Sequence, residues 1–260
     1  MEKLLEFLAW LVKVLFGRDS ESPAPKTPRE TPVDETVTGW EGDPPYRYID
    51  VSRYQGAINW AQVAAAGYKG AMLKTVSTNR KLSKRADGLY IDPTFEDNYR
   101  NAKAAGLDVG VYYYTYATSE EMADAELSLL RKAVHGKELT LPVAVDVEDN
   151  ELKLMSTIDL TNLTAYALEQ VEKMGFYAQL YTYTGYKYEL DMARLAGRWD
   201  VWLADYTGKT PNVTFNYNAH QHTSKGAVPG ISGNVDLNVT TLNYPKIISK
   251  KGLTRLREGK

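Results

Sequence analysis

The 260-residue sequence contains no cysteine, which excludes disulfide bonds and metal sites built on thiolates. Its three histidines form no spaced metal-binding motif, so we expect neither a metal nor another cofactor. The chain has no basic excess, with 31 Lys and Arg against 33 Asp and Glu, which argues against a nucleic-acid-binding protein. Phenylalanine is scarce, with 5 residues against 19 tyrosines. Tyrosine combines an apolar face with a hydroxyl group, which suits both sugar-binding clefts and half-buried strands.

Residues 1–17 form a short apolar segment whose narrow polar side carries Glu2, Glu6 and Lys13. The pattern predicts a helix, but its apolar core is shorter than the roughly 20 residues that span a bilayer. The segment also lacks the basic start and the cleavage site of a signal peptide. Three interpretations stay open: a membrane anchor at the bilayer interface, an oligomerisation helix, and a helix docked on the following domain.

Residues 18–45 are rich in proline, serine, threonine and charge, which predicts an extended linker. From residue 46 to 245, apolar strand patterns alternate with helical patterns, which indicates a parallel sheet. Strands are expected at 48–51, 71–76, 108–114, 141–147, 177–182, 201–204, 219–222 and 235–237, and helices at 60–66, 94–105, 120–134, 160–174 and 185–195. Eight strands favour a closed TIM-like barrel over an open doubly wound sheet, because no G-x-G-x-x-G follows the first strand.

Two carboxylates stand at the end of the strongest strand pattern, the apolar run from Leu141 to Glu148. Strand side chains alternate, so Asp146 and Glu148 point the same way. Burial and mutual repulsion should raise the pKa of at least one of them, as glycosidic-bond cleavage requires. The alternative is an acidic loop start, since Asp149 and Glu151 follow.

Two further acidic residues extend this argument. Asp50 closes the first expected strand, and Asp236 lies in the last one. In a parallel barrel the active site lies at the carboxyl ends of the strands, so these residues should meet Asp146 and Glu148 at one mouth. Each residue alone can be explained as a turn former, because Asp is common at strand ends.

Six segments between residues 48 and 238 resemble, in order, the motifs of the glycoside hydrolase family 25 lysozymes, including the phage endolysin type. They are D-x-S-x-x-Q-G at 50–56, D-P-x-F-x-x-N at 92–98, G-x-Y at 110–112, D-x-E at 146–148, W-x-A-x-Y at 202–206 and G-I-x-G-x-V-D-x-N at 230–238. The resemblance implies an irregular (β/α)5(β)3 barrel. It also implies a muramidase that cuts the β-1,4 bond between N-acetylmuramic acid and N-acetylglucosamine, in a cell-lysis role of phage or prophage type.

The same resemblance assigns roles to individual residues. Glu148 becomes the general acid and Asp146 the second carboxylate, which supports charge or orients the 2-acetamido group. Asp50 and Asp236 shape the cleft and keep Glu148 protonated. We favour assistance by the substrate acetamido group over a carboxylate nucleophile, because carboxylates at i and i+2 lie side by side. The residues expected to bind the sugar are Tyr112, Tyr114, Tyr183, Trp202, Gln55 and Lys74.

The chain departs from the family pattern after Lys74, where Thr75–Asn79 lacks the usual Glu and Gly, and at His222, where Tyr is common. A non-catalytic glycan-binding barrel is one alternative function. A chitinase-like enzyme is another, although Leu141 and Ala144 stand where that family needs Asp. Residues 246–260 predict a basic, solvated tail. We expect a monomer that is made in the bacterial cytoplasm and acts on peptidoglycan in the cell wall or periplasm, with residues 1–17 as a candidate inner-membrane contact.

Overall fold

The computed structural model describes residues 46–79 and 81–257. The expected N-terminal helix and linker therefore lie outside the described residues. Within the described part of the chain, no helix is long and apolar enough to cross a membrane.

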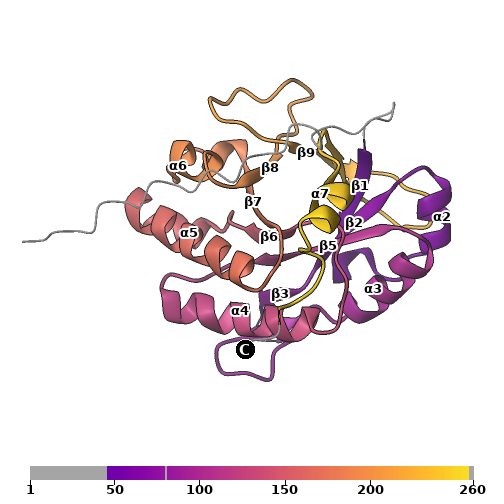
Figure 1. Cartoon of the computed structure of the whole chain (residues 1–260), viewed down its shortest axis with the longest axis horizontal. Helices are drawn as coiled ribbons and strands as arrows, with labels where there is room; N and C mark the ends of the chain where they lie inside the picture. Colours follow the sequence, from indigo (N-terminus) through magenta and orange to yellow (C-terminus); the bar gives the residue numbers. More distant parts are fainter. Residues whose placement is uncertain (1–45, 80, 258–260) are drawn as a thin grey trace, which may run out of the picture. The chain divides into compact units, whose positions relative to one another are not determined.

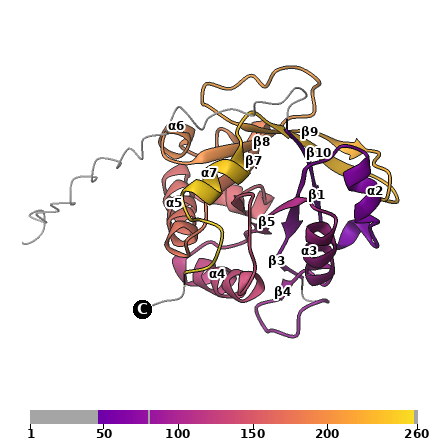
Figure 2. The same ribbon diagram turned by 45° about the vertical axis from the view of Figure 1, so that its right-hand side comes forward.

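Eight strands close into a barrel, as the sequence predicts, in the order β1-β10-β9-β8-β7-β6-β5-β2 (Figure 1, with β10 labelled in Figure 2). They are β1 (Tyr46–Val51), β2 (Gly70–Lys74), β5 (Asp108–Tyr114), β6 (Val143–Asp146), β7 (Ala178–Tyr183), β8 (Asp200–Ala204), β9 (Ala219–Gly226) and β10 (Val235–Thr240). Neighbouring strands are parallel except at β10, which is antiparallel to both β9 and β1.

Five helices follow the first five barrel strands and cover the barrel from outside (Figures 1 and 2). They are α2 (Trp60–Ala65), α3 (Phe95–Ala104), α4 (Glu120–Val134), α5 (Thr157–Lys173) and α6 (Met192–Ala196). No helix separates β8, β9 and β10 in this described region, so the expected (β/α)5(β)3 architecture is confirmed. Short 3-10 turns stand at η1 (Arg53–Gln55), η2 (Asn150–Leu154) and η3 (Thr184–Tyr186).

Three local expectations were wrong. The strand expected at 71–76 ends at Lys74, and the chain then forms a separate hairpin of β3 (Val76–Thr78) and β4 (Leu89–Ile91). The helix expected at 185–195 is divided into η3 and α6, because the Asp191 side chain caps a new helix by accepting from the backbone N–H of Arg194. The expected solvated tail contains α7 (Tyr244–Lys250), described next.

Helix α7 closes the end of the barrel where the parallel strands begin. Its residues Tyr244 and Ile248 are buried among side chains of the barrel interior. The hydroxyl of Tyr244 accepts from Gln179 Nε2 at 2.8 Å and donates to Asp200. Gln179 is the second residue of β7 and Asp200 is the first residue of β8. Since this end is filled, the opposite end is the open mouth.

The core has two parts, as the period of two in a strand requires. Aliphatic residues on the outward strand faces, such as Val143, Val145 and Leu180, pack against the helices. The inward faces contribute an aromatic cluster that includes Tyr48, Tyr181 and Trp202.

Candidate active site

The D-x-S-x-x-Q-G motif positions Asp50 through hydrogen bonds of the polar residues that follow it in the chain. Ser52 caps η1 in a capping box, in which Gln55 Oε1 accepts from the backbone N–H of Ser52. Gly56 follows with a φ of 62°, a left-handed conformation that favours glycine. Gln55 Nε2 also donates to the backbone oxygen of Asn234 at 3.2 Å. The loop after β1 is thereby tied to the loop before β10, next to Asp50.

The D-P-x-F-x-x-N motif has a related positioning role. The buried Asp92 accepts from the backbone N–H of Arg53 at 3.0 Å and from both donors of Thr94. Asn98 donates to the Thr94 hydroxyl in turn. This motif therefore joins the start of α3 to the loop that follows Asp50.

The alternation expected along β6 is present. Val145 and Val147 are buried in the outer core, whereas Asp146 and Glu148 line a pocket at the mouth. Asp146 is 3% exposed and Glu148 is half-buried. Asp146 Oδ1 is buried and has no hydrogen-bond partner. This oxygen is free to accept a donor from a bound molecule.

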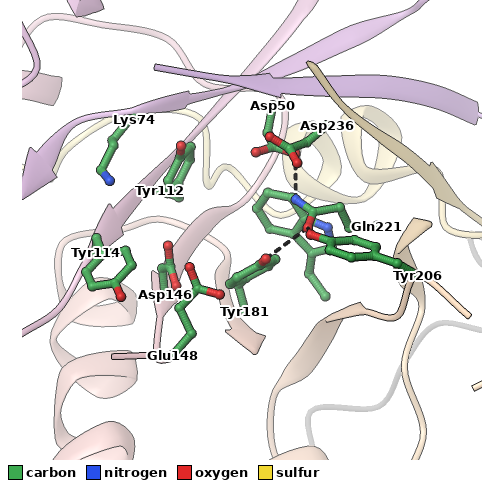
Figure 3. A pocket seen from close by; sticks show the side chains of 11 residues that line it. Asp50, Lys74, Tyr112, Tyr114, Asp146, Glu148, Tyr181, Tyr206, Gln221 and Asp236 are labelled. Carbon is green, nitrogen blue, oxygen red and sulfur yellow. Dashed lines mark hydrogen bonds between the residues drawn. The ribbon is translucent and has the colours of Figure 1, made fainter. Parts of the chain in front are cut away.

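All four predicted acids line this one pocket, where Figure 3 shows Asp50 beside Asp236 and Asp146 beside Glu148. Asp236 reaches the mouth in a different way from the other three. It is the second residue of the antiparallel β10 and stands directly opposite Asp50 in the strand register. Because β10 is antiparallel to β1, the first residues of β10 lie at the same edge of the barrel as the last residues of β1.

Burial is the main influence on the pKa values of these acids. Burial and the Glu148 carboxyl raise the pKa of Asp146 well above its ordinary range. Burial also raises the pKa of Glu148, which Lys74 lowers and Asp236 raises. Burial raises the pKa of Asp236 to about 6. For Asp50, burial and then Asp236 raise the pKa, while hydrogen bonds from Asn238 and Gln221 lower it.

Lys74 is the cation of this pocket, at the end of β2. Its ammonium group lies 4.8 Å from the ring centroid of Tyr114 and 5.8 Å from that of Tyr112. Both rings are half-buried pocket residues, so they offer apolar surface to a sugar.

Three of the expected sugar-binding residues have surroundings that the sequence did not reveal. Trp202 lines the pocket but is 1% exposed, packed against Tyr48, Tyr112 and Tyr181. Tyr183 does not line the pocket, and its hydroxyl accepts from Lys153 Nζ at 2.8 Å. Gln55 does not line it either and serves the loop contacts described above.

The pocket also contains Tyr181, Tyr206 and Gln221, which sequence reasoning did not select. Tyr181 shares a strand face with Tyr183, and Tyr206 ends the W-x-A-x-Y motif. Gln221 Oε1 accepts from the hydroxyls of both tyrosines, and Gln221 Nε2 donates to Asp50 at 2.8 Å. The W-x-A-x-Y motif could have indicated Tyr206, and the alternation of side chains along the strand could have indicated Tyr181.

The neighbouring histidines stand outside this pocket. His222 is half-buried, and burial lowers its pKa. No group of three or more His, Cys, Asp or Glu side chains among the described residues is arranged to hold a metal ion.

A closed α/β barrel with paired acids at its open mouth is the arrangement expected of a barrel glycosidase. The family model of the glycosyl hydrolases family 25 matches residues 49–231, so the chain belongs to that family.

The chain is 30% identical over 192 residues to an autolytic lysozyme of Clostridium acetobutylicum, covering 73% of this chain and 54% of that protein. It therefore spans about half the length of that relative. It is 28% identical over 223 residues to lysozyme M1 of Streptomyces globisporus, covering 79% and 71%. Its fold matches the bacterial lysozyme from Streptomyces coelicolor with a TM-score of 0.65 and 25% identity, over 76% of this chain and 93% of that one.

Proposed function

We propose that this protein hydrolyses peptidoglycan at the β-1,4 bond between N-acetylmuramic acid and N-acetylglucosamine. The observation that carries the proposal is the pairing of a half-buried Glu148 with a buried Asp146 whose Oδ1 has no partner. Family membership and the lysozyme names of the relatives support the same substrate.

Glu148 acts first as the general acid. Burial keeps its proton in place, and its half-exposed position lets it reach the glycosidic oxygen. The acetamido oxygen of the sugar attacks C1 while the C1–O bond breaks and the leaving oxygen takes the Glu148 proton. Asp146 Oδ1 accepts the acetamido N–H and so stabilises the positive charge of the cyclic intermediate.

Glu148 then acts as a base in the second step. Its carboxylate takes a proton from water, the water oxygen bonds to C1, and the acetamido group is restored. The two steps return Glu148 to its protonated form. Tyr112, Tyr114 and Lys74 bind the sugar on one side of the pocket.

A digest of purified peptidoglycan by the full chain tests this proposal. The fragments are reduced with borohydride and identified by mass spectrometry. Reduced muramic acid at the new ends is expected. Reduced glucosamine ends would indicate the other glycosidic bond, and binding without new reducing ends would favour a non-catalytic glycan-binding barrel.

We also propose a cellular setting for this activity. The protein is made in the cytoplasm, acts as a monomer of phage or prophage type on the wall, and contacts the inner membrane through residues 1–17. The apolar pattern of that segment and the polar linker support the contact. Deletion of residues 1–17 should move the protein from the membrane fraction to the soluble fraction without loss of activity. Unchanged fractionation would contradict the anchor.

A further inference from the structure

Asn238 is held in one orientation by Trp202. The indole Nε1–H can only donate, and it donates to Asn238 Oδ1 at 2.8 Å. The amide nitrogen of Asn238 therefore faces the other way, toward Asp50 Oδ2, at 2.8 Å. Both Trp202 and Asn238 are 1% exposed, so water does not compete for these contacts.

Gln221 is held in the same manner from the other side. Its Oε1 accepts from Tyr181 at 2.9 Å and from Tyr206, which leaves its Nε2 to donate to Asp50 Oδ2 at 2.8 Å. Two amide donors thus converge on one oxygen of Asp50. That oxygen is fully used as an acceptor, so a proton on Asp50 is confined to Oδ1.

The partner for this proton stands directly across the sheet. Asp236 pairs with Asp50 in the antiparallel register of β1 and β10, so their side chains are neighbours on one face. Asp50 is buried and Asp236 is half-buried. Two neighbouring carboxyls with so little access to water do not both ionise easily, and a shared proton relieves their repulsion.

We propose that Asp50 and Asp236 form a second carboxyl pair that binds one proton, and that Asn238 and Gln221 are positioning residues for it. Together they direct the proton to Asp50 Oδ1 and Asp236 and away from Asp50 Oδ2. The pair then keeps one negative charge in the mouth at neutral pH, where the proposed reaction develops positive charge on the sugar. The catalytic role of the pair rests on the proposed function, whereas the shared proton itself does not.

The ionisable groups around the pair come from β1, β2, β5, β7, the end of β6 and the segment after β8. Facing it are Tyr48, Lys74, Tyr112, Asp146, Glu148, Tyr181 and Tyr206. Lys74 is the one cation among these described neighbours, and the figure places it across the pocket, next to Tyr112 and Tyr114 (Figure 3). The amide donors are therefore the nearest groups that favour an ionised Asp50.

A carbon-13 NMR titration of the Asp carboxyl carbons in the full chain tests the pair directly. Signals are assigned with Asp50→Asn and Asp236→Asn. We expect two ionisation steps separated by more than about one pH unit, which is the mark of a coupled pair. Independent titration of both carboxyls below pH 5 would overturn the proposal, whether or not the protein cleaves peptidoglycan.

Trp202→Phe tests the positioning role, with Trp60→Phe as the matched control. Both substitutions keep a ring in a buried site, but the Trp60 indole N–H has no partner to lose. Trp202→Phe frees the Asn238 amide, so the lower ionisation step should move up by about one unit. The acid limb of kcat/KM should move in the same direction. Trp60→Phe should move neither.

Tyr206→Phe provides a second variant that leaves Trp202 in place. Tyr206 is 52% exposed, and the substitution removes only the hydroxyl that donates to Gln221. The same step should move up by a smaller amount. Titration curves of Trp202→Phe and Tyr206→Phe that coincide with the wild type would overturn the positioning role.

Discussion

Both ends of the barrel contain buried aspartates, but the aspartates at the two ends differ in how many hydrogen bonds they accept. At the closed end, Asp200 accepts from Gln179 at 2.9 Å, from Asn218 at 2.8 Å and from Tyr244. At the mouth, Asp146 Oδ1 is buried without a partner. Burying a carboxyl without partners is costly, so its persistence at one end needs a reason other than stability.

Asp108 at the closed end repeats the pattern of Asp200. It accepts from the Tyr46 hydroxyl and from the Thr140 hydroxyl, each at 2.8 Å. The closed end therefore uses carboxyls to complete the barrel, whereas the mouth leaves acceptor capacity for a ligand. The difference teaches that hydrogen-bond satisfaction, more than residue type or burial, separates Asp146 from Asp108 and Asp200; Asp50, which accepts from Gln221 and Asn238, lies between these extremes.

The largest effect is expected from Glu148→Gln, which removes the proposed proton donor of the mouth. Turnover of purified peptidoglycan should fall about 1,000-fold or more, because general acid catalysis contributes up to about 10⁴-fold. The unfolding temperature should not fall, since the amide keeps the shape of the side chain and the repulsion between Glu148 and Asp146 is lost. Near-wild-type turnover would mean that the acid lies elsewhere.

Asp146→Asn should separate activity from stability at the mouth. The amide has one acceptor oxygen instead of two and no charge, so kcat/KM should fall about 100-fold. The midpoint of urea unfolding at pH 7 should rise, because burial and then the Glu148 carboxyl oppose a negative charge at this position. Lower stability with full activity would place Asp146 in the structural class together with Asp200.

The mouth could be predicted from the sequence where strand parity decides the outcome. Alternation along 141–148 places Asp146 and Glu148 on one face whatever the surrounding fold. Parity does not tell how far up a strand the pocket extends, which is why Tyr183 was selected and Tyr181 was not. Gln221 was missed because its importance lies in contacts with Tyr206 and Asp50, far away in the sequence.

The closed end was harder to predict. In and directly after α7, the apolar residues Tyr244, Ile247 and Ile248 alternate with three lysines, Lys246, Lys250 and Lys251, so the segment has the composition of a solvated tail. Only the filled barrel interior shows what these apolar residues bury. Similarly, nothing local in 235–240 indicates that β10 runs antiparallel to its neighbours.

Asp200→Ala should have the reverse profile of Asp146→Asn. It leaves the donors of Gln179, Asn218 and Tyr244 without their acceptor, which should lower the free energy of unfolding by about 1–3 kcal/mol. The folded fraction should keep kcat/KM within about twofold of the wild type, since ordinary structural losses spare a distant site. Urea unfolding followed by peptidoglycan turnover at 25 °C measures both. Lost activity at unchanged stability would break the division between the two ends.

The smallest effect concerns the pH dependence of stability, and its sign follows from Asp236. The folded pKa of about 6 lies above the ordinary carboxyl value, so between pH 4 and 6 the folded state binds a proton that the unfolded state has released. Stability from this group is present below pH 4 and is lost as the pH rises through 6.

In this pH range, Asp236→Asn should reduce the slope of the unfolding free energy against pH by up to the amount that corresponds to about one bound proton. Asp97→Asn, an exposed carboxyl paired with Arg100, is the control with the same change of charge. If the two variants flatten the slope equally, the burial of the acids at the mouth does not govern their ionisation, and the contrast with the closed end rests on hydrogen bonds alone.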